Sequence, residues 1–393
     1  MMEWAKKPLG SLATYINGHA FKPADWQQTG LPIIRIENLN NPKAMHNYYQ
    51  GEIAEKYKVK SGDILVSWSA SLDAFIWSKQ DAVLNQHIFK VIPNEDIVDS
   101  DFLFFVLKKA IADLLELVHG ATMKHINRPE FEKFEVFLPK DIETQKAIAA
   151  KLTAQLTEVE KAKEAVEMQV SELEQFKLKI QEKALALLKG VPRLPLEHFL
   201  EGIEAGKSIK TTELPARKDE LGVLKVSAVS WDKFQPDEAK SIEAGYVPKE
   251  SHKVRKGDLI ISRANTIELV GAVVLVDKHY PNRLLSDKTL RLILSKENEI
   301  KPEYLLQILK LQEARSHIED NATGTSDSMR NISQKTINKI PIPKVGLGKQ
   351  QELIQLFDNC EEHISKAEES LNDMLEELST IPQKILNEAF QAN

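Results

Sequence analysis

The chain has 393 residues, which is long enough for two globular domains with connecting elements. Hydrophobic residues make up 42% and charged residues 28% of it, a balance typical of folded domains rather than of disordered chains. The single cysteine, Cys360, excludes an intrachain disulfide and a cysteine-rich zinc site. No apolar stretch approaches the roughly 20 residues that span a bilayer, and no apolar run follows the N-terminal Met-Met-Glu-Trp-Ala-Lys-Lys. We therefore expect a protein of the reducing cytoplasm.

The formal charge of −6 argues neither for nor against a nucleic-acid partner. Residues 347–393 carry 3 basic and 10 acidic side chains, so the acidity is concentrated in the last segment. The other 346 residues are close to neutral. Neutral domains bind DNA when their cations gather on one face, so charge alone decides nothing here.

Residues 1–142 predict an α+β domain. Short apolar runs bounded by turn residues predict strands, at residues 33–37, 64–67, 75–77 and 89–92. A longer segment with helical periodicity, residues 101–118, predicts one helix.

Residues 143–190 predict one long helix. Apolar side chains recur there every seven residues, at Leu152, Val159, Val166, Leu173, Ile180 and Leu187. This is the pattern of a coiled-coil seam. The second seam position is mixed, with Ile148, Gln155, Ala162, Gln169 and Phe176, which indicates a wider or less regular contact surface.

Residues 191–346 predict a second α+β domain. Its expected strands lie at residues 223–226, 259–261, 272–276 and 290–294. One helix is expected over residues 302–319, because Pro302 suits the first turn of a helix.

Residues 347–393 predict a second long helix. One seam contains Phe357, Ile364, Leu371, Leu378 and Ile385, and the other contains Leu353, Cys360, Ala367, Met374 and Ile381. Pro382 is expected to kink or end this helix near Ile381. Neither long helix can bury its seam alone, so we expect the two to pack as an antiparallel coiled coil. A parallel pair is possible, but it would crowd both domains at one end.

An internal repeat connects the two halves of the chain. Residues 57–67 (YKVKSGDILVS) match residues 252–262 (HKVRKGDLIIS), and residues 120–126 answer residues 324–332. In the long helices the offset settles at 205 residues, so that Gln145 corresponds to Gln350. Such repetition predicts that one supersecondary unit is used twice.

The motifs of a self-contained enzyme are missing. The segment Gly202–Ser208 (GIEAGKS) has three residues between its glycines where a phosphate-binding loop needs four. No Asn/Asp-Pro-Pro-aromatic sequence and no His-Glu-x-x-His occurs, and the ten histidines are scattered. We therefore expect no catalytic residue, no bound metal and no cofactor in this chain.

The repeated pattern resembles the specificity subunits of Type I restriction–modification enzymes. The residues that carry the resemblance are KSGDILVS at 60–67 and KGDLIIS at 256–262. Proline-ended strands near 137–139 and 340–343, each leading into a helix start with Gln145 or Gln350, add to it. The resemblance covers essentially the whole chain, although the Glu-Gln usual at the helix start is Thr144-Gln145 and Lys349-Gln350 here.

The resemblance implies four segments with distinct roles. Residues 1–142 and 191–346 would be target recognition domains, each reading half of a bipartite, asymmetric site in double-stranded DNA. The helices of residues 143–190 and 347–393 would form a spacer and a dock for two methyltransferase subunits. S-adenosylmethionine would bind those methyltransferase subunits, and restriction subunits would join through them.

Two loop regions in each domain are candidates for DNA contact. Bases are read chiefly by Arg or Lys on guanine and by Asn or Gln on adenine, and such side chains often lie on loops of a rigid scaffold. One loop follows the Gly-Asp strand and the other precedes the proline-ended strand. The candidates are Ser69, Ser71, Lys124, His125, Asn127 and Arg128 in the first domain, and Arg263, Asn265, Thr266, Ser326, Ser328, Arg330 and Asn331 in the second.

A rival hypothesis is a scaffold protein, in which a coiled coil presents two β-rich modules that bind protein or sugar. Heptads alone would support that function equally well. The paired Gly-Asp strands and the loop cations favour DNA recognition, and the family resemblance decides between the two.

Overall fold

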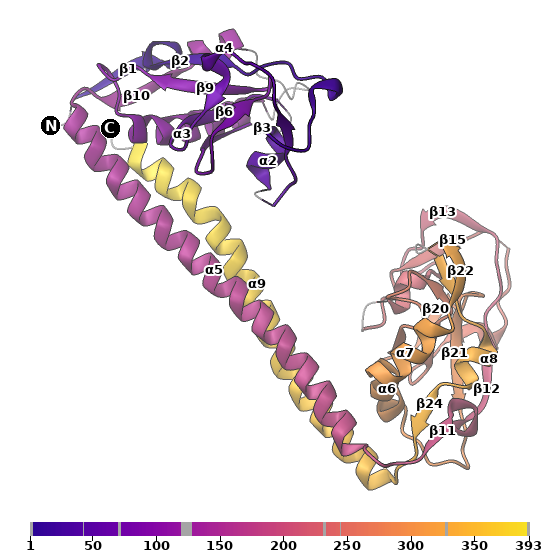
Figure 1. Cartoon of the computed structure of the whole chain (residues 1–393). Coiled ribbons are helices and arrows are strands. Elements are labelled where there is room, and N and C mark those ends of the chain that lie inside the picture. Colours follow the sequence, from indigo (N-terminus) through magenta and orange to yellow (C-terminus); the bar gives the residue numbers. More distant parts are fainter. Residues whose placement is uncertain are drawn as a thin grey trace. The chain divides into compact units, whose positions relative to one another are not determined.

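The computed structural model describes residues 3–41, 43–69, 72–118, 128–230, 233–243, 245–326 and 329–390, without the side chains of Val118, Glu213 and Thr325. Its chain divides into two compact units (Figure 1). Unit 1 comprises Met1–Met168 with Leu371–Asn393, and unit 2 comprises Gln169–Ser370.

Unit 1 contains a two-stranded sheet and two four-stranded sheets. The sheet orders are β1-β10, β2-β9-β6-β7 and β4-β3-β8-β5, and all pairs are antiparallel except β3 with β8. The strands are β1 (Trp4–Pro8), β2 (Ala13–Asn17), β3 (Leu31–Ile34), β4 (Asn47–Tyr49), β5 (Lys58–Val59), β6 (Ile64–Ser67), β7 (Asp73–Ile76), β8 (Ala82–Leu84), β9 (Ile88–Pro93) and β10 (Glu135–Pro139). The helices are α1 (Leu9–Leu12), α2 (Ile36–Asn40), α3 (Ser100–Val118) and α4 (Arg128–Lys133), with 3-10 turns at Pro23–Asp25 and Glu55–Tyr57.

Unit 2 is built on a similar plan with more strands. The sheet orders are β11-β24, β12-β21-β17-β19, β13-β15-β14-β20-β16 and β18-β23-β22, with β14 and β20 parallel. The strands are β11 (Arg193–Pro195), β12 (Leu200–Ala205), β13 (Thr211–Pro215), β14 (Gly222–Leu224), β15 (Ala239–Ile242), β16 (Lys253–Val254), β17 (Leu259–Ser262), β18 (Ala264–Asn265), β19 (Val273–Leu275), β20 (Tyr280–Leu284), β21 (Thr289–Leu294), β22 (Thr323–Ser326), β23 (Met329–Asn331) and β24 (Pro341–Pro343). The helices are α6 (Pro302–Lys310), α7 (Gln312–Asp320) and α8 (Gln334–Asn338), with 3-10 turns at Leu196–Phe199, Val226–Val229 and Glu250–His252.

The strand after each Gly-Asp turn is buried on both faces. In β6, Ile64 and Val66 enter the core that α3 covers, and Leu65 enters the core of the other sheet. In β17, Leu259 and Ile261 lie in one core and Ile260 in the other. Because successive side chains of a strand point to opposite faces, only an unbroken apolar run can serve both cores. The matched sequences KSGDILVS and KGDLIIS therefore encode the central strand of each unit.

The two long helices, α5 (Ile142–Leu187) and α9 (Leu347–Phe390), run antiparallel. In unit 1, Leu152 from the beginning of α5 shares a core with Leu386 from the end of α9. In unit 2, Ile180 from the end of α5 shares a core with Phe357 from the beginning of α9. Lys177 forms an ion pair with Glu368 in unit 2. The predicted α+β fold with an antiparallel coiled coil is confirmed, and the parallel alternative is excluded.

Two helix predictions are wrong in their limits. The helix expected over residues 302–319 is two helices, because Leu311 adopts an extended conformation (φ −71°, ψ 153°) between α6 and α7. Of the two outcomes expected at Pro382, a kink or an end, the end is wrong, because α9 continues to Phe390. A proline inside a helix costs about 3 kcal/mol. Burial of Leu386 and contact of Phe390 with Phe102 in the core of unit 1 offset that cost.

The predicted seams also differ at six positions, because Gln155, Ala162, Gln169, Phe176, Leu187 and Met374 are exposed. Leu187 and Met374 are exposed by 36% and 47% of their surfaces, respectively. The neighbouring Leu188 is fully buried instead of Leu187. A straight helix of 3.6 residues per turn drifts relative to a seven-residue repeat, so a strict heptad loses its register over several turns.

Candidate nucleic-acid interface

In unit 2, three strand ends meet at one edge of the sheet that contains β17. The register pairs Ala205 at the end of β12 with Leu290, and Ser262 at the end of β17 with Thr289 at the start of β21. The segments that leave this edge are tied together by the backbone. The N–H of Gly206 donates to the carbonyl oxygen of Ser286 (3.1 Å).

The close approach at Gly206 requires glycine. A Cβ atom at this position would lie 1.9 Å from the carbonyl oxygen of Leu285. No side chain can be accommodated at that distance without moving the backbone. The loop after β12 is therefore held directly against the loop before β21.

The two loop regions predicted for the second domain form one small sheet. Strand β18 pairs antiparallel with β23, so that Ala264 lies opposite Asn331 and Asn265 lies opposite Arg330. The N–H of Ile332 donates to the carbonyl oxygen of Arg263 (2.9 Å). Segments more than 60 residues apart in the sequence thus place Arg263, Asn265, Arg330 and Asn331 side by side, with Ser326 on the adjoining strand β22.

Hydrogen bonds hold several of these candidates in place. The amide Nδ2 of Asn265 donates to the Ser230 hydroxyl (2.8 Å), and its Oδ1 accepts the N–H of Thr266 (2.9 Å). Arg330 Nη1 donates to the carbonyl oxygen of Gly324 (3.0 Å). Asn265 and Arg330 are half-buried and belong to a defined surface rather than to a freely moving loop.

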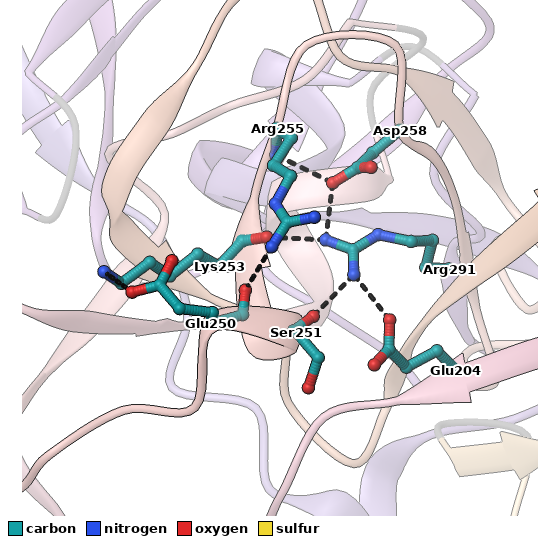
Figure 2. Close-up of polar contacts among 7 residues, drawn as sticks. All are labelled: Glu204, Glu250, Ser251, Lys253, Arg255, Asp258 and Arg291. Atoms are coloured by element: carbon teal, nitrogen blue, oxygen red, sulfur yellow. Dashed lines mark hydrogen bonds and ion pairs between the residues drawn. The ribbon is translucent and has the colours of Figure 1, made fainter.

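In the middle of the same sheet, Arg291 ties β21 to its neighbours (Figure 2). Only 7% of its surface is exposed. Its Nη2 lies 2.6 Å from the Asp258 carboxylate and its Nη1 lies 2.6 Å from that of Glu204. The same two nitrogens donate to the carbonyl oxygens of Lys253 and Ser251, both at 2.6 Å. One guanidinium therefore fixes β12, β17 and β21 relative to one another.

Sequence reasoning did not single out Arg291. The signal was a charged residue within the otherwise apolar strand Thr289–Leu294 (TLRLIL). A charge in a buried strand is costly unless it is paired, so its presence indicates partners elsewhere in the fold. The corresponding strand of unit 1, Ile88–Pro93 (IFKVIP), carries Lys90 in the same kind of position.

Unit 1 has an edge of the same construction. Asn17 at the end of β2 lies opposite Phe89, and Ser67 at the end of β6 lies opposite Ile88. The N–H of Gly18 donates to the carbonyl oxygen of Ile88 (3.1 Å), as Gly206 does to Ser286 in unit 2. Trp68 follows β6 where Arg263 follows β17.

The aromatic and polar groups at the unit 1 edge differ from those in unit 2. The rings of Trp68 and His87 lie 5.7 Å apart, and Gln86 Nε2 lies 3.2 Å from His87 Nε2. Ser69 is half-buried beside them in the chain. Arg128 begins α4, donates to the carbonyl oxygen of Tyr15 (2.9 Å) and pairs with Glu132 (2.7 Å). The predicted Ser71, Lys124, His125, Asn127 and Ser328 lie outside the described residues.

The part of the chain that the structure describes contains no cluster of metal-ligating side chains, and Gly202–Ser208 does not form a phosphate-binding loop. Among the described residues, no group of three or more His, Cys, Asp and Glu side chains could hold a metal ion. In the segment Gly202–Ser208, strand β12 runs to Ala205 and the next element is strand β13 rather than a helix. A phosphate-binding loop needs a helix start at that point. No described helix is long and apolar enough to cross a membrane.

Comparison with known proteins gives one consistent family. Residues 1–168 and 206–377 match the family described as Type I restriction modification DNA specificity domain. The specificity subunit of the Type I restriction enzyme EcoBI from Escherichia coli is 24% identical, over 99% of this chain and 85% of that protein. The EcoKI specificity subunit from Escherichia coli K12 is also 24% identical, over 99% of this chain and 88% of its own length.

Two solved structures share the fold. A chain from a study of complex assembly and conformational transition of the Type I restriction–modification system superposes with a TM-score of 0.71 at 16% identity, covering 99% of this chain and 98% of its own. The HsdS subunit from Thermoanaerobacter tengcongensis superposes with a TM-score of 0.54 at 16% identity, covering 99% and 97%.

Proposed function

The chain belongs to the Type I restriction–modification DNA specificity family, and we propose that it reads a bipartite, asymmetric DNA site, one half with each unit. Its relatives are the specificity subunits of restriction enzymes, which are not catalytic. Recognition of a DNA sequence is therefore the role of this chain, and catalysis lies in other subunits of the complex.

The observation that carries the proposal is a repeated sheet edge with different side chains. Both edges are formed by the ends of three strands, and both are closed by a glycine against the neighbouring loop. Unit 1 presents Trp68 and His87, whereas unit 2 presents Arg263, Asn265 and Arg330. Because base edges are discriminated by donor and acceptor patterns, different side chains favour different half-sites.

The helix pair is proposed as the dock for two methyltransferase subunits and, through them, restriction subunits. Phe176 and Leu178 on α5 expose 48% and 51% of their surfaces. Also in unit 2, a cavity of about 650 Å³ beside the helices is lined in part by Ile180, Leu309 and Phe357. Exposed apolar groups next to a recess are typical of protein contact surfaces.

S-adenosylmethionine would bind to the methyltransferase partner and not to this chain. The chain would act in the cytoplasm, where the DNA that it reads lies. The helix pair would set the spacing between the two half-sites.

The test is methylome sequencing of a host that carries this chain and its methyltransferase partner. The expected methylated motif has two unlike specified halves separated by unspecified bases. A single continuous motif or a palindrome would contradict the bipartite, asymmetric reading. The rival scaffold function predicts no methylation that depends on this chain and no retention of the complex on a specific duplex.

A further inference from the structure

A hollow lined by lysines lies next to Arg263, Asn265 and Arg330, the residues of unit 2 that are candidates for contact with DNA bases. Its volume is about 430 Å³. Its walls come from the loop after β12, from β14 with the following 3-10 turn, from β15, and from the loop before β21. The charged residues that line it are Lys207, Lys225, Lys240, Asp287 and Lys288.

The hollow adjoins the predicted contact residues. The N–H of Arg263 donates to the carbonyl oxygen of Lys288 (2.9 Å), so the loop that lines the hollow also borders the start of β18. Ser230, which follows the 3-10 turn Val226–Val229 in the wall, accepts the hydrogen bond from Asn265. A ligand in the hollow would therefore lie beside Arg263 and Asn265.

The charge of the hollow favours an anion. Lys207 and Lys288 are exposed and form no ion pair with any residue that the structure describes. Lys225 lies 2.6 Å from Glu238, which also accepts a hydrogen bond from the Ser227 hydroxyl (2.5 Å). These hydrogen bonds, that from Lys225 above all, lower the pKa of the Glu238 carboxyl. Glu238 therefore neutralises Lys225, and the exposed Lys207 and Lys288, with the Asp287 carboxylate beside them, are the groups that a ligand would meet first.

The hollow lacks the features of a nucleotide site. Gly206, Lys207 and Ser208 connect two strands, so this segment does not lead into a helix as a phosphate-binding loop does. The available groups are flexible ammonium ions and the exposed Ser208 hydroxyl. Such groups suit an isolated phosphodiester, because Lys binds phosphate as a point charge without fixed geometry.

We propose that this hollow holds backbone phosphates of the DNA half-site that unit 2 reads, with Lys207 and Lys288 as the contacting residues. The inference rests on the proposed function and deepens it. Phosphate contacts fix the register of a protein on the duplex without reading its sequence, whereas contacts to base edges determine the sequence specificity. Lys207 and Lys288 thus position the DNA so that Arg263, Asn265 and Arg330 reach base edges.

The test compares Lys207→Gln/Lys288→Gln with the parent chain, each assembled with its methyltransferase partner. Affinity for the target duplex and for an unrelated duplex is measured over a series of salt concentrations. Each lost phosphate contact reduces the magnitude of the negative slope of log affinity against log salt by about 1. The slope of the double variant is therefore shallower than that of the parent by about 2. The affinities for both duplexes fall by the same factor, and the methylated sequence is unchanged.

A matched control uses two exposed lysines at the opposite end of the same strands. Lys256 lies in the turn before β17 and Lys296 follows β21. The variant Lys256→Gln/Lys296→Gln retains the salt slope of the parent. The charge-conserving Lys207→Arg/Lys288→Arg also retains it, which separates loss of charge from misfolding.

Three results would overturn the inference. In the first, the parent complex binds the duplex and Lys207→Gln/Lys288→Gln keeps the full salt slope. This result would show that the two lysines do not contact phosphate, and it would leave the proposed function intact. An equal loss in the control pair does the same. Binding of inorganic phosphate or ATP to the chain alone, lost in the double variant while the DNA slope is unchanged, identifies a free-anion site. A parental chain that binds no duplex refutes the proposed function itself.

Discussion

The two units use the same frame and differ where they face a ligand. The shared frame is clearest at Gln145 and Gln350, which are both buried at the start of a long helix. Gln145 accepts the N–H of Asp99 (2.8 Å) and donates to the carbonyl oxygens of Ile97 and Pro139 (3.1 and 2.8 Å). Gln145 therefore joins α5 to the loop that precedes α3.

The contacts of Gln350 repeat that arrangement. It accepts the N–H of Lys301 (2.8 Å) and donates to the carbonyl oxygens of Glu299 and Val345 (2.9 and 3.1 Å). The sequence repeat thus preserves the joint between domain and helix. It does not preserve the side chains at the sheet edges, which is where two half-sites would have to be distinguished.

The buried cation in the central sheet of each unit, Lys90 or Arg291, is partly shared and partly different. Lys90 pairs with Asp63 (2.6 Å) and donates to the carbonyl oxygen of Lys58 (2.9 Å). Arg291 pairs with two carboxylates and two carbonyl groups. The position is shared, but the planar guanidinium makes twice as many connections as the ammonium.

The largest expected effect comes from breaking this buried network. Arg291→Ala leaves Asp258 and Glu204 without their buried counter-charge and should lower the free energy of unfolding of unit 2 by about 3–5 kcal/mol. Lys90→Ala should cost less, because it removes one ion pair whose groups are partly exposed. Denaturation of each full-length variant measures the difference, and Arg291→Lys should recover part of it. Equal losses for Arg291→Ala and Lys90→Ala would contradict this account of the two frames.

A second pair of variants tests whether the joints between domain and long helix are equivalent in the two units. Gln145→Leu and Gln350→Leu each leave one N–H and two carbonyl groups without a partner. Each should destabilise its unit by about 1–3 kcal/mol, and the two costs should agree within the uncertainty of the measurement. Unequal costs, measured by the same denaturation experiment, would show that the two helix joints are not equivalent.

A smaller and more local effect is expected at the sheet edge. Arg263→Ala should reduce discrimination by about 1–3 kcal/mol at one base position of the half-site read by unit 2. The methylated motif should relax at that position, and the other half should keep its sequence. Lys256→Ala, on the opposite edge, is the control. A motif unchanged by Arg263→Ala would remove this residue from the reading surface.

Much of the frame was predictable from local pattern. The strand at residues 64–67, the helix at 101–118 and the two long helices follow from apolar runs and periodicity, which are properties of the nearby sequence. The parallel pairing of β3 with β8 and the two-residue strand β5 were not predicted. Such short elements are held by their neighbours in the sheet rather than by their own residues.

The candidate site was predicted in parts but not assembled. Arg263 with Asn265, and Arg330 with Asn331, were expected on two separate loops, and their pairing in one sheet depends on tertiary contacts. The lysine-lined hollow escaped detection for the same reason, because Lys207 and Lys288 are 81 positions apart in the sequence. Spacing along a chain gives little information about side chains that meet only across a sheet edge.

The central claim, that each unit reads its own half-site, is tested most directly by exchanging one recognition domain. Residues 1–142 are replaced by the corresponding domain of a relative with a different specificity, and the methylome is sequenced with the same methyltransferase partner. The account predicts that one half of the methylated motif changes while the other half, its orientation and the spacing persist. A change in both halves, or in neither, would contradict independent reading by the two units.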